Sequence, residues 1–258
     1  MTTHPFTALV TGASSGIGAA CARALARRGD RLVLCARRPD RLDAFVTQLR
    51  EETAAPIHAF ALDVRDAQAV ERALAALPAE FANIDVLVNN AGLSRAMDPA
   101  YANEVRHIDD MVDTNVKGLL YVTRAVVPGM LERGRGHVVN IGSTAGHAVY
   151  PGGTVYAATK HAVDAITRGL KMDLHGSPIR VSTVDPGLVE TDFSLVRFEG
   201  DAARAAAVYS STAPLTADDV ADAVLWAVTR PARVNVAEII LMPTVQSSVT
   251  MIQRDTSS

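Results

Sequence analysis

Four polar residues have the types and the spacing of a proton-transfer centre: Asn115, Ser143, Tyr156 and Lys160. Tyr156 and Lys160 lie four positions apart in a stretch typical of a helix, so both side chains leave one face and reach the same small space. A free tyrosine has a pKa near ~10 and is a poor base at neutral pH until adjacent positive charge, from Lys160 or an oxidised nicotinamide, lowers that value. The Ser143 hydroxyl can hold a carbonyl or alcohol oxygen while Tyr156 gives or takes its proton.

Each of these features also has an ordinary structural interpretation when it stands alone. A tyrosine and a lysine at this spacing are common on solvated helices, and a lone serine in a glycine-rich stretch is usually a turn residue. Asn115 could be a helix-interior residue that bonds only to backbone. What favours the catalytic interpretation is a second motif near the start of the chain.

That motif is a glycine-rich loop, TGASSGIG at 11–18, between the apolar run 6–10 and the helix-favouring, Ala-rich segment 19–28. A strand, a glycine turn and a helix together can bind a pyrophosphate on the free N–H groups of the helix start. The spacing Gly-x3-Gly-x-Gly differs from the commoner G-x-G-x-x-G, but the flanking elements make the signal strong. The loop residues expected to contact a dinucleotide are Gly12, Ser14, Ser15, Gly16, Ile17 and Gly18.

The end of the second apolar run predicts NADP rather than NAD. An NAD enzyme usually has an acidic residue there, which binds the ribose hydroxyls and repels a 2′-phosphate. This chain has Ala36 followed by Arg37 and Arg38. Arg37 is the preferred candidate for the phosphate, and Arg38 either stacks on adenine or also binds the phosphate. Without the glycine loop, an arginine pair that caps an exposed loop would be the better interpretation.

Apolar runs alternate with longer helical stretches along the chain, which predicts an α/β fold. We expect a Rossmann-like, doubly wound sheet of seven parallel strands with helices on both faces. The expected strands are 6–11, 31–36, 56–61, 84–89, 136–142, 179–184 and 235–241. Ligands of such sheets bind outside the carboxyl ends of the strands, so motifs that follow the strands should meet there. We expect one catalytic domain at 1–246, with a substrate lid around 187–212, and a polar tail at 247–258.

Taken in order, TGASSGIG, NNAG at 89–92 and the four residues Asn115, Ser143, Tyr156 and Lys160 resemble the motifs of the short-chain dehydrogenase/reductase family. The resemblance covers essentially the whole chain. It implies that Lys160 also bonds the nicotinamide ribose and that Asn115 holds a water of a proton relay. Beyond the loop and the arginine pair, it implies cofactor contacts at Asp63, Val64, Asn90, Ala91, Gly92, Tyr156, Lys160, Pro186, Gly187, Val189 and Thr191.

Segments 150–160, 191–201 and 235–246 are similar to NADP-dependent 3-hydroxy-acid dehydrogenases of the serine and allo-threonine type, with sulfoacetaldehyde reductases as a sister group. This implies hydride transfer between NADP(H) and a short anionic hydroxy acid or its semialdehyde. The alternatives are a sulfonate-aldehyde reductase, another carbonyl reductase, and an NADP-sensing binding protein, which would not need the intact tetrad. Expected substrate contacts are Ser143, Arg95, His147, Tyr150 and Arg197.

Arg95 and Arg197 matter most for the substrate class, because a guanidinium can bind a carboxylate or sulfonate with paired hydrogen bonds. For each arginine the alternative is an ordinary solvated loop charge. His147 and Arg95 also depart from what the resemblance leads us to expect near the site.

The composition fits an enzyme that handles a small molecule. The chain has 258 residues and a net charge of −3, without the basic runs of a nucleic-acid-binding protein. Its amino terminus lacks the cationic start and long apolar core of a signal peptide, so we expect a cytoplasmic protein without a membrane partner. Cys21 and Cys35 form no CxxC pair and the histidines are scattered, so no metal chemistry is expected. The apolar run 238–243 resembles an interface of the family's tetramers, which implies a homotetramer.

Overall fold

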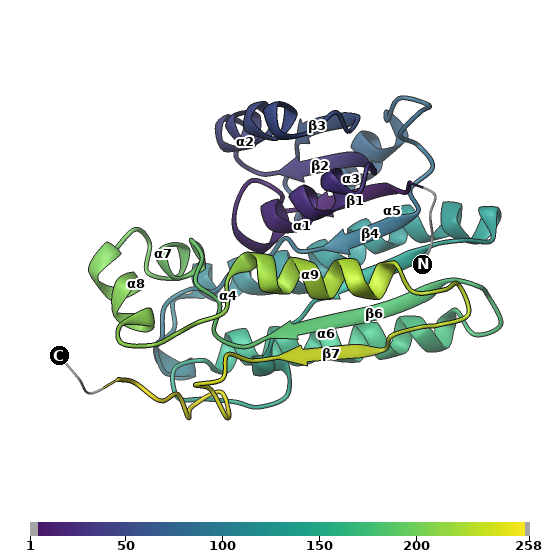
Figure 1. Cartoon of the computed structure of the whole chain (residues 1–258). Coiled ribbons are helices and arrows are strands. Elements are labelled where there is room, and N and C mark those ends of the chain that lie inside the picture. The colour runs from purple at the N-terminus through teal and green to yellow at the C-terminus, as the bar shows by residue number, and fades with distance from the viewer. Residues whose placement is uncertain (1–4, 256–258) are drawn as a thin grey trace.

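Within residues 5–255, which the structure describes, seven parallel strands form one sheet in the order β3-β2-β1-β4-β5-β6-β7 (Figure 1). This computed structural model confirms the predicted doubly wound α/β fold. Residues 1–4 of the predicted domain and 256–258 of the predicted tail lie outside the described residues. The strands are β1 (Thr7–Thr11), β2 (Arg31–Ala36), β3 (Ile57–Ala61), β4 (Val86–Asn89), β5 (His137–Ile141), β6 (Arg180–Pro186) and β7 (Glu238–Leu241).

Helices cover both faces of the sheet, because each buried strand presents apolar side chains to both sides. The helices are α1 (Gly16–Arg27), α2 (Pro39–Glu52), α3 (Ala67–Ala75), α4 (Val105–Val112), α5 (Leu119–Arg133), α6 (Thr154–Asp173), α7 (Phe193–Arg197), α8 (Ala202–Tyr209) and α9 (Ala217–Val228). Three short turns of other helical types complete the set: η1 (Ala100–Ala102), the π-helical η2 (Asp113–Gly118) and η3 (Thr144–Gly146). Helices α1, α2 and α9 pack on one face, and α3, α5 and α6 pack on the other.

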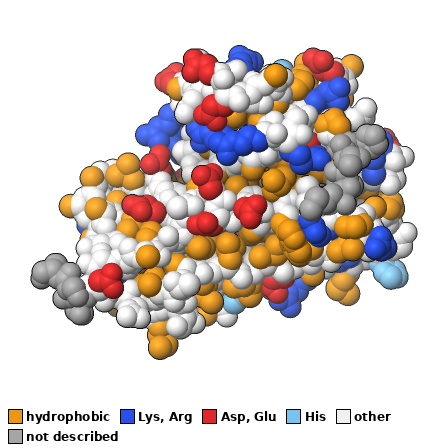
Figure 2. Space-filling model, viewed as in Figure 1, with side chains coloured by type: hydrophobic (Ala, Val, Ile, Leu, Met, Phe, Trp, Pro, Cys, Tyr) orange, Lys and Arg blue, Asp and Glu red, His pale blue; other side chains and the backbone are white. Residues whose placement is uncertain are grey.

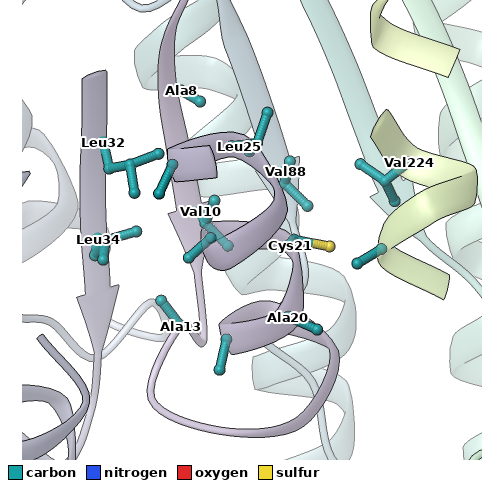
Figure 3. Packing of buried hydrophobic residues seen from close by; sticks show 14 of the residues in the cluster. Ala8, Val10, Ala13, Ala20, Cys21, Leu25, Leu32, Leu34, Val88 and Val224 are labelled. Atoms are coloured by element: carbon teal, nitrogen blue, oxygen red, sulfur yellow. The ribbon is translucent and has the colours of Figure 1, made fainter. Parts of the chain in front are cut away.

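The two cysteines are packing residues, Cys21 in the core with α1 and α9 and Cys35 in the core on the opposite face. In Figure 3 the sulfur of Cys21 on α1 points toward Val224 on α9, with Val10 and Val88 of the sheet beneath. Both Cys21 and Cys35 are fully buried and unpaired. Burial raises the pKa of each thiol to about 12, so both stay protonated and unreactive at neutral pH.

The strand order reverses its direction of winding between β1 and β4. Crossover connections leave these two neighbouring strands toward opposite sides, which opens a crevice at their carboxyl ends, where doubly wound proteins bind ligands. Helices α7 and α8 lie beyond the arrowheads of β6 and β7, at the same end of the molecule (Figure 1). The fold therefore directs the search for a site to this edge.

On the face that Figure 2 shows, acidic, basic and apolar side chains are interspersed. Among the described helices, none combines the length and the apolar character that a membrane span requires.

Candidate active site

A cavity of about 550 Å³ occupies the carboxyl edge of the sheet and reaches from the glycine loop to α7, α8 and the end of the chain. Most of the predicted site residues line it. They are Gly12, Ser14, Ser15, Gly16, Ile17, Arg37, Arg38, Asp63, Val64, Asn90, Ala91, Gly92, Ser143, Tyr150, Tyr156, Lys160, Pro186, Gly187, Val189, Thr191 and Arg197. Gly18, Asn115, Arg95 and His147 are not part of its lining.

The start of α1 has the properties of an anion site. Ser15 begins the helix without a side-chain cap, and its first turn contains no acidic residue. Gly16 and Ile17 of this turn line the cavity. The first N–H groups of a helix have no partner within it and carry partial positive charge. Their position suits the pyrophosphate of a dinucleotide.

Two glycines allow the loop to pack this tightly. Gly12 has φ +65°, and a Cβ there would lie 2.9 Å from the Cα of Ala91. A Cβ at Gly18 would lie 2.4 Å from the carbonyl oxygen of Gly12. Asn90 fixes the loop by donating from Nδ2 to the carbonyls of Thr11 and Gly12, at 2.9 and 3.1 Å. Gly18 therefore shapes the loop from behind instead of lining the cavity, and the Asn90 amide is committed to the protein.

Positive charge gathers at the other end of the nucleotide crevice. Arg37 and Arg38 line the cavity, and Arg41 follows one turn later on α2. Burial, together with the charges of Arg41 and Arg37, lowers the pKa of Arg38. Repulsion between neighbouring guanidinium groups is relieved by an anion such as a phosphate.

The two residues of the YxxxK pair lie on one buried face of α6, as their spacing predicts. The Lys160 Nζ donates to the carbonyl oxygen of Ile141 at 2.8 Å and lies 5.9 Å from the centre of the Tyr156 ring. Ser143 follows β5 and accepts a hydrogen bond from the Ala145 N–H at 3.1 Å. One segment at the end of β5 and the helix α6 thus place the three side chains in a single cavity.

Burial shifts the pKa values of both Tyr156 and Lys160. Burial raises the pKa of Tyr156 to about 12; Arg197, and a hydrogen bond from Ser143, act in the opposite direction. Burial lowers the pKa of Lys160 to about 8, against the opposing charge of Asp185. Without added positive charge Tyr156 is therefore a phenol at neutral pH, which is the state of a proton donor. Arg197 is the cation that favours its ionisation in the chain itself.

Asn115 lies behind the cavity in the π-helical turn η2 and not in the lining. Its Oδ1 accepts from the Leu93 N–H at 2.8 Å, and its Nδ2 donates to the Leu93 carbonyl at 2.8 Å and to the Thr159 hydroxyl at 3.0 Å. Both amide hydrogens are thus committed to the protein. The side chain ties the loop after β4 to α6, and its predicted part in a water relay stays a prediction.

The expectation that Arg95 faces the substrate is corrected by its contacts. Its Nε donates to the Asp110 carboxylate at 3.2 Å, and a terminal nitrogen donates to the Val196 carbonyl at 3.0 Å. The side chain is only 14 % exposed. Since its donors point to α4 and α7, Arg95 holds α7 against the body of the domain.

His147 is corrected in the same way. Its Nε2 lies 2.9 Å from Asp185, near the end of β6, and 3.3 Å from Glu238, the first residue of β7. The ring therefore points away from the cavity. Although His147 is close to Ser143 in sequence, its contact with the buried Asp185 carboxylate determines the position of the ring.

Arg197 does reach the cavity, from the end of α7. Its guanidinium carbon lies 5.6 Å from the centre of the Tyr156 ring and 5.1 Å from that of Phe193. The buried Nε has no hydrogen-bond partner, a terminal nitrogen donates to the Met97 Sδ at 3.9 Å, and no carboxylate of the described residues pairs with this guanidinium. The guanidinium therefore stands over the tyrosine without an ionic partner from the described part of the chain.

The predicted polar tail contains site residues that sequence reasoning missed. Val249, Ile252 and Arg254 line the cavity, so no boundary at residue 246 separates the tail from the site. A bridge joins Gln246 to Ile252, and Arg254 donates to the Val208 carbonyl of α8 at 3.2 Å. The signal available in the sequence was the presence of single apolar residues, Val249 and Ile252, within the polar tail. Apolar side chains in such a segment indicate that it packs against the domain.

Comparisons with known proteins show the family of this chain. Residues 6–201 match the short chain dehydrogenase family. An NADP-dependent 3-hydroxy acid dehydrogenase of Escherichia coli (strain K12) is 48% identical over 93% of this chain and 95% of its own length. Sulfoacetaldehyde reductase 2 of Chromohalobacter salexigens is 44% identical over 96% of this chain and 98% of its own. The closed form of a serine dehydrogenase complexed with NADP+ superposes with a TM-score of 0.91, at 46% identity, over 96% of this chain and 99% of that one. The chain therefore belongs to the short-chain dehydrogenase/reductase family of oxidoreductases.

Proposed function

We propose that this enzyme transfers a hydride between NADP(H) and a short anionic 3-hydroxy acid or its semialdehyde. The observation that carries the substrate class is Arg197, a half-buried guanidinium over the ring of Tyr156 that has a buried, unsatisfied Nε and no carboxylate partner among the described residues. A partly desolvated charge without an ionic partner is costly, and a carboxylate that binds a guanidinium through two hydrogen bonds offsets that cost. Relatives named for 3-hydroxy acid and serine substrates support this choice.

The residues of the cavity fit the cofactor along its length. The uncapped start of α1 would hold the pyrophosphate, and Arg37 with Arg38 would hold the 2′-phosphate. When bound, the nicotinamide supplies or accepts the hydride.

The chain's own residues handle the proton. In reduction, the Tyr156 phenol donates its proton to the substrate oxygen, to which the Ser143 hydroxyl also donates a hydrogen bond. Lys160 supplies positive charge behind the tyrosine, from a position fixed by the Ile141 carbonyl. Arg197 holds the acid group, which fixes the distance between the carbonyl and Tyr156.

Arg197→Met tests the substrate class. The loss of a desolvated, charge-assisted contact should lower kcat/KM for an acidic substrate by roughly ten- to a hundredfold and change that for its neutral ester or alcohol little. Steady-state kinetics on 3-hydroxypropionate and serine beside their neutral analogues measures this. Arg204→Met is the matched control, because Arg204 stacks on Phe198 and does not line the cavity. Equal losses on charged and neutral substrates would remove the basis of the hydroxy-acid proposal.

A sulfonate is the second candidate for the acid group, because a relative is named for sulfoacetaldehyde and a guanidinium binds a sulfonate equally well. The same kinetic comparison with sulfoacetaldehyde distinguishes the two. A larger kcat/KM for the sulfonate would assign this enzyme to the reductase group and leave the role of Arg197 unchanged.

Arg37→Ala tests the cofactor. If Arg37 binds the 2′-phosphate, its removal should weaken NADPH binding by roughly ten- to a hundredfold and leave NADH binding almost unchanged. Fluorescence titration with each nucleotide measures both constants. Arg50→Ala, on the helix α2 that follows Arg37 but outside the cavity lining, controls for the general loss of positive charge. A parallel loss for both nucleotides would mean that Arg37 is structural.

The homotetramer and the cytoplasmic location stay predictions. Apolar side chains of Trp226, Ile240 and Met242 are exposed on α9 and around the outer strand β7. Large apolar groups at a sheet edge are typical of surfaces that an assembly covers.

A further inference from the structure

Three possible metal ligands meet outside the catalytic cavity, although they are far apart in sequence. His147 follows η3, Asp185 lies near the end of β6 and Glu238 begins β7. The His147 Nε2 lies 2.9 Å from an oxygen of Asp185 and 3.3 Å from an oxygen of Glu238, and the three ligand atoms all lie within 4.8 Å of one another. Tetrahedral ligands at zinc-like bond lengths stand about 3.4 Å apart. The cluster is thus close to the size of a coordination shell.

The sheet itself brings the two carboxylates together. Glu238 pairs with Thr183 on β6, and Asp185 lies two residues beyond Thr183. Because side chains alternate between the faces of a strand, Glu238 and Asp185 project from the same face. The loop after η3 then places His147 over both of them.

Asp185 is held as metal ligands usually are. The Thr183 hydroxyl donates to its Oδ1 at 2.6 Å, which leaves Oδ2 to face His147. A Cβ on Gly142 would lie 1.7 Å from Oδ1, so only glycine leaves room for this carboxylate. Hydrogen bonds from a second layer of residues orient and fix ligands in metal sites.

A single N–H group of His147 cannot donate a well-directed hydrogen bond to both carboxylates. A single Nε2–H bond points in one direction, whereas two acceptors from different strands approach this nitrogen. Asp185 is only 3% exposed, so water solvates its negative charge poorly. A divalent cation would bind all three ligand atoms at once and neutralise both carboxylates.

The cations around the cluster come from α6. Lys160 interacts electrostatically with Asp185 from the catalytic side and is hydrogen-bonded to the Ile141 carbonyl. Arg168 interacts electrostatically with both Glu238 and Asp185, but its Nε donates to Asp164 at 2.8 Å. Neither has an ion pair with Asp185 or Glu238 among the described residues. The cluster is therefore only partly balanced by its surroundings.

We propose that His147, Asp185 and Glu238 bind one divalent transition-metal ion of the zinc type, with its open position toward solvent. Imidazole favours such ions over Mg²⁺, which prefers oxygen ligands alone. His147 and Glu238 are partly exposed, at 26% and 33% of their side chains, which gives the ion a path to the site. This site differs from the metal-free expectation from sequence, and it is independent of the proposed substrate.

Calorimetric titration of the full-length, tag-free protein with Zn²⁺ tests the proposal. We expect one ion per chain, weaker binding of Mg²⁺, and a visible absorption spectrum of tetrahedral type with Co²⁺ as the probe. His147→Gln and Glu238→Gln should each weaken Zn²⁺ binding by at least roughly ten- to a hundredfold. This is the loss of affinity that follows when a residue that only supports a metal ligand is replaced. Zn²⁺ should also raise the Tm of the wild type and not that of either variant.

His175→Gln is the matched control, because His175 is exposed and lies outside the cluster. It should bind Zn²⁺ as the wild type does. The two substituted ligands are the exposed ones, so both variants are expected to fold, which circular dichroism checks. No Zn²⁺ binding by the wild type, or binding by both ligand variants as tight as that of the wild type, would overturn the proposal and leave the cluster as contacts of one imidazole with two carboxylates.

Discussion

Replacing Tyr156 with phenylalanine is expected to lower turnover by roughly a hundredfold or more while cofactor binding is retained. The substitution removes only the hydroxyl. Tyr156 is buried at 8% exposure and packs edge to face on Phe193, with ring centres 5.6 Å apart, and a phenyl ring keeps this contact. Because the phenol is the proton donor in the proposed mechanism, the chemical step should lose its general acid.

Stopped-flow single-turnover kinetics with NADPH measures the chemical step, and fluorescence titration measures cofactor binding. Tyr121→Phe is the matched control, since Tyr121 lies on α5 outside the cavity lining. Near-normal single-turnover rates in Tyr156→Phe would rule out the tyrosine as the acid.

Acid is expected to destabilise the fold through His137, which lies in β5 and is only 1% exposed. Its Nε2 contacts the Ser182 hydroxyl at 2.7 Å, and its Nδ1 has no hydrogen-bond partner. Burial lowers the pKa of His137 to about 3, with further contributions from Arg180 and Lys171. The histidine is therefore neutral in the folded chain across the range in which it takes up a proton when unfolded, near pH ~6.5.

The sign follows from proton linkage. Below about pH 6.5 the unfolded chain binds a proton that the folded chain does not, so the free energy of unfolding falls as pH falls, until His137 also titrates in the fold near pH 3. The slope for one proton is about 1.4 kcal/mol per pH unit, or roughly 2–3 kcal/mol between pH 6.5 and 4.5. Above pH 6.5 this contribution is fully present and constant.

Urea unfolding at a series of pH values measures this effect in wild type and in His137→Gln, whose side chain cannot be charged. The variant should lose less stability than the wild type between pH 6.5 and 4.5, whatever its stability at pH 7.5. His175→Gln should follow the wild type, because His175 is exposed. Parallel curves for His137→Gln and the wild type would mean that this histidine titrates alike in both states.

The order of strands and helices could be predicted because each element has a recognisable pattern in its own stretch of sequence. The runs 32–36 and 86–88 are apolar without interruption, as strands covered on both faces must be, and they lie in β2 and β4. The glycine loop and the YxxxK pair were also readable, since a turn with φ +65° at Gly12 and a four-residue helical spacing are short-range features. Neither depends on what the rest of the chain does.

Side-chain partners far apart in sequence could not be predicted in this way. Arg95 and His147 stand near catalytic segments in the sequence, but Asp110, Val196 and Asp185 hold them elsewhere. A charged side chain binds the carboxylate or carbonyl that packing brings within reach, and local sequence does not say which one that is. The same reason explains why the wall formed by Val249 and Ile252 was missed.

The sequence by itself determined the family and the seven-stranded sheet, and it supplied the residues proposed to move a proton, because these follow from local patterning and from motifs of fixed spacing. The tertiary structure alone decided which arginine stands over Tyr156, that burial keeps this tyrosine protonated, and that His147 meets Asp185 and Glu238. These properties depend on burial and on distances between separate elements. Such quantities come into existence only when the sheet and its helices pack together.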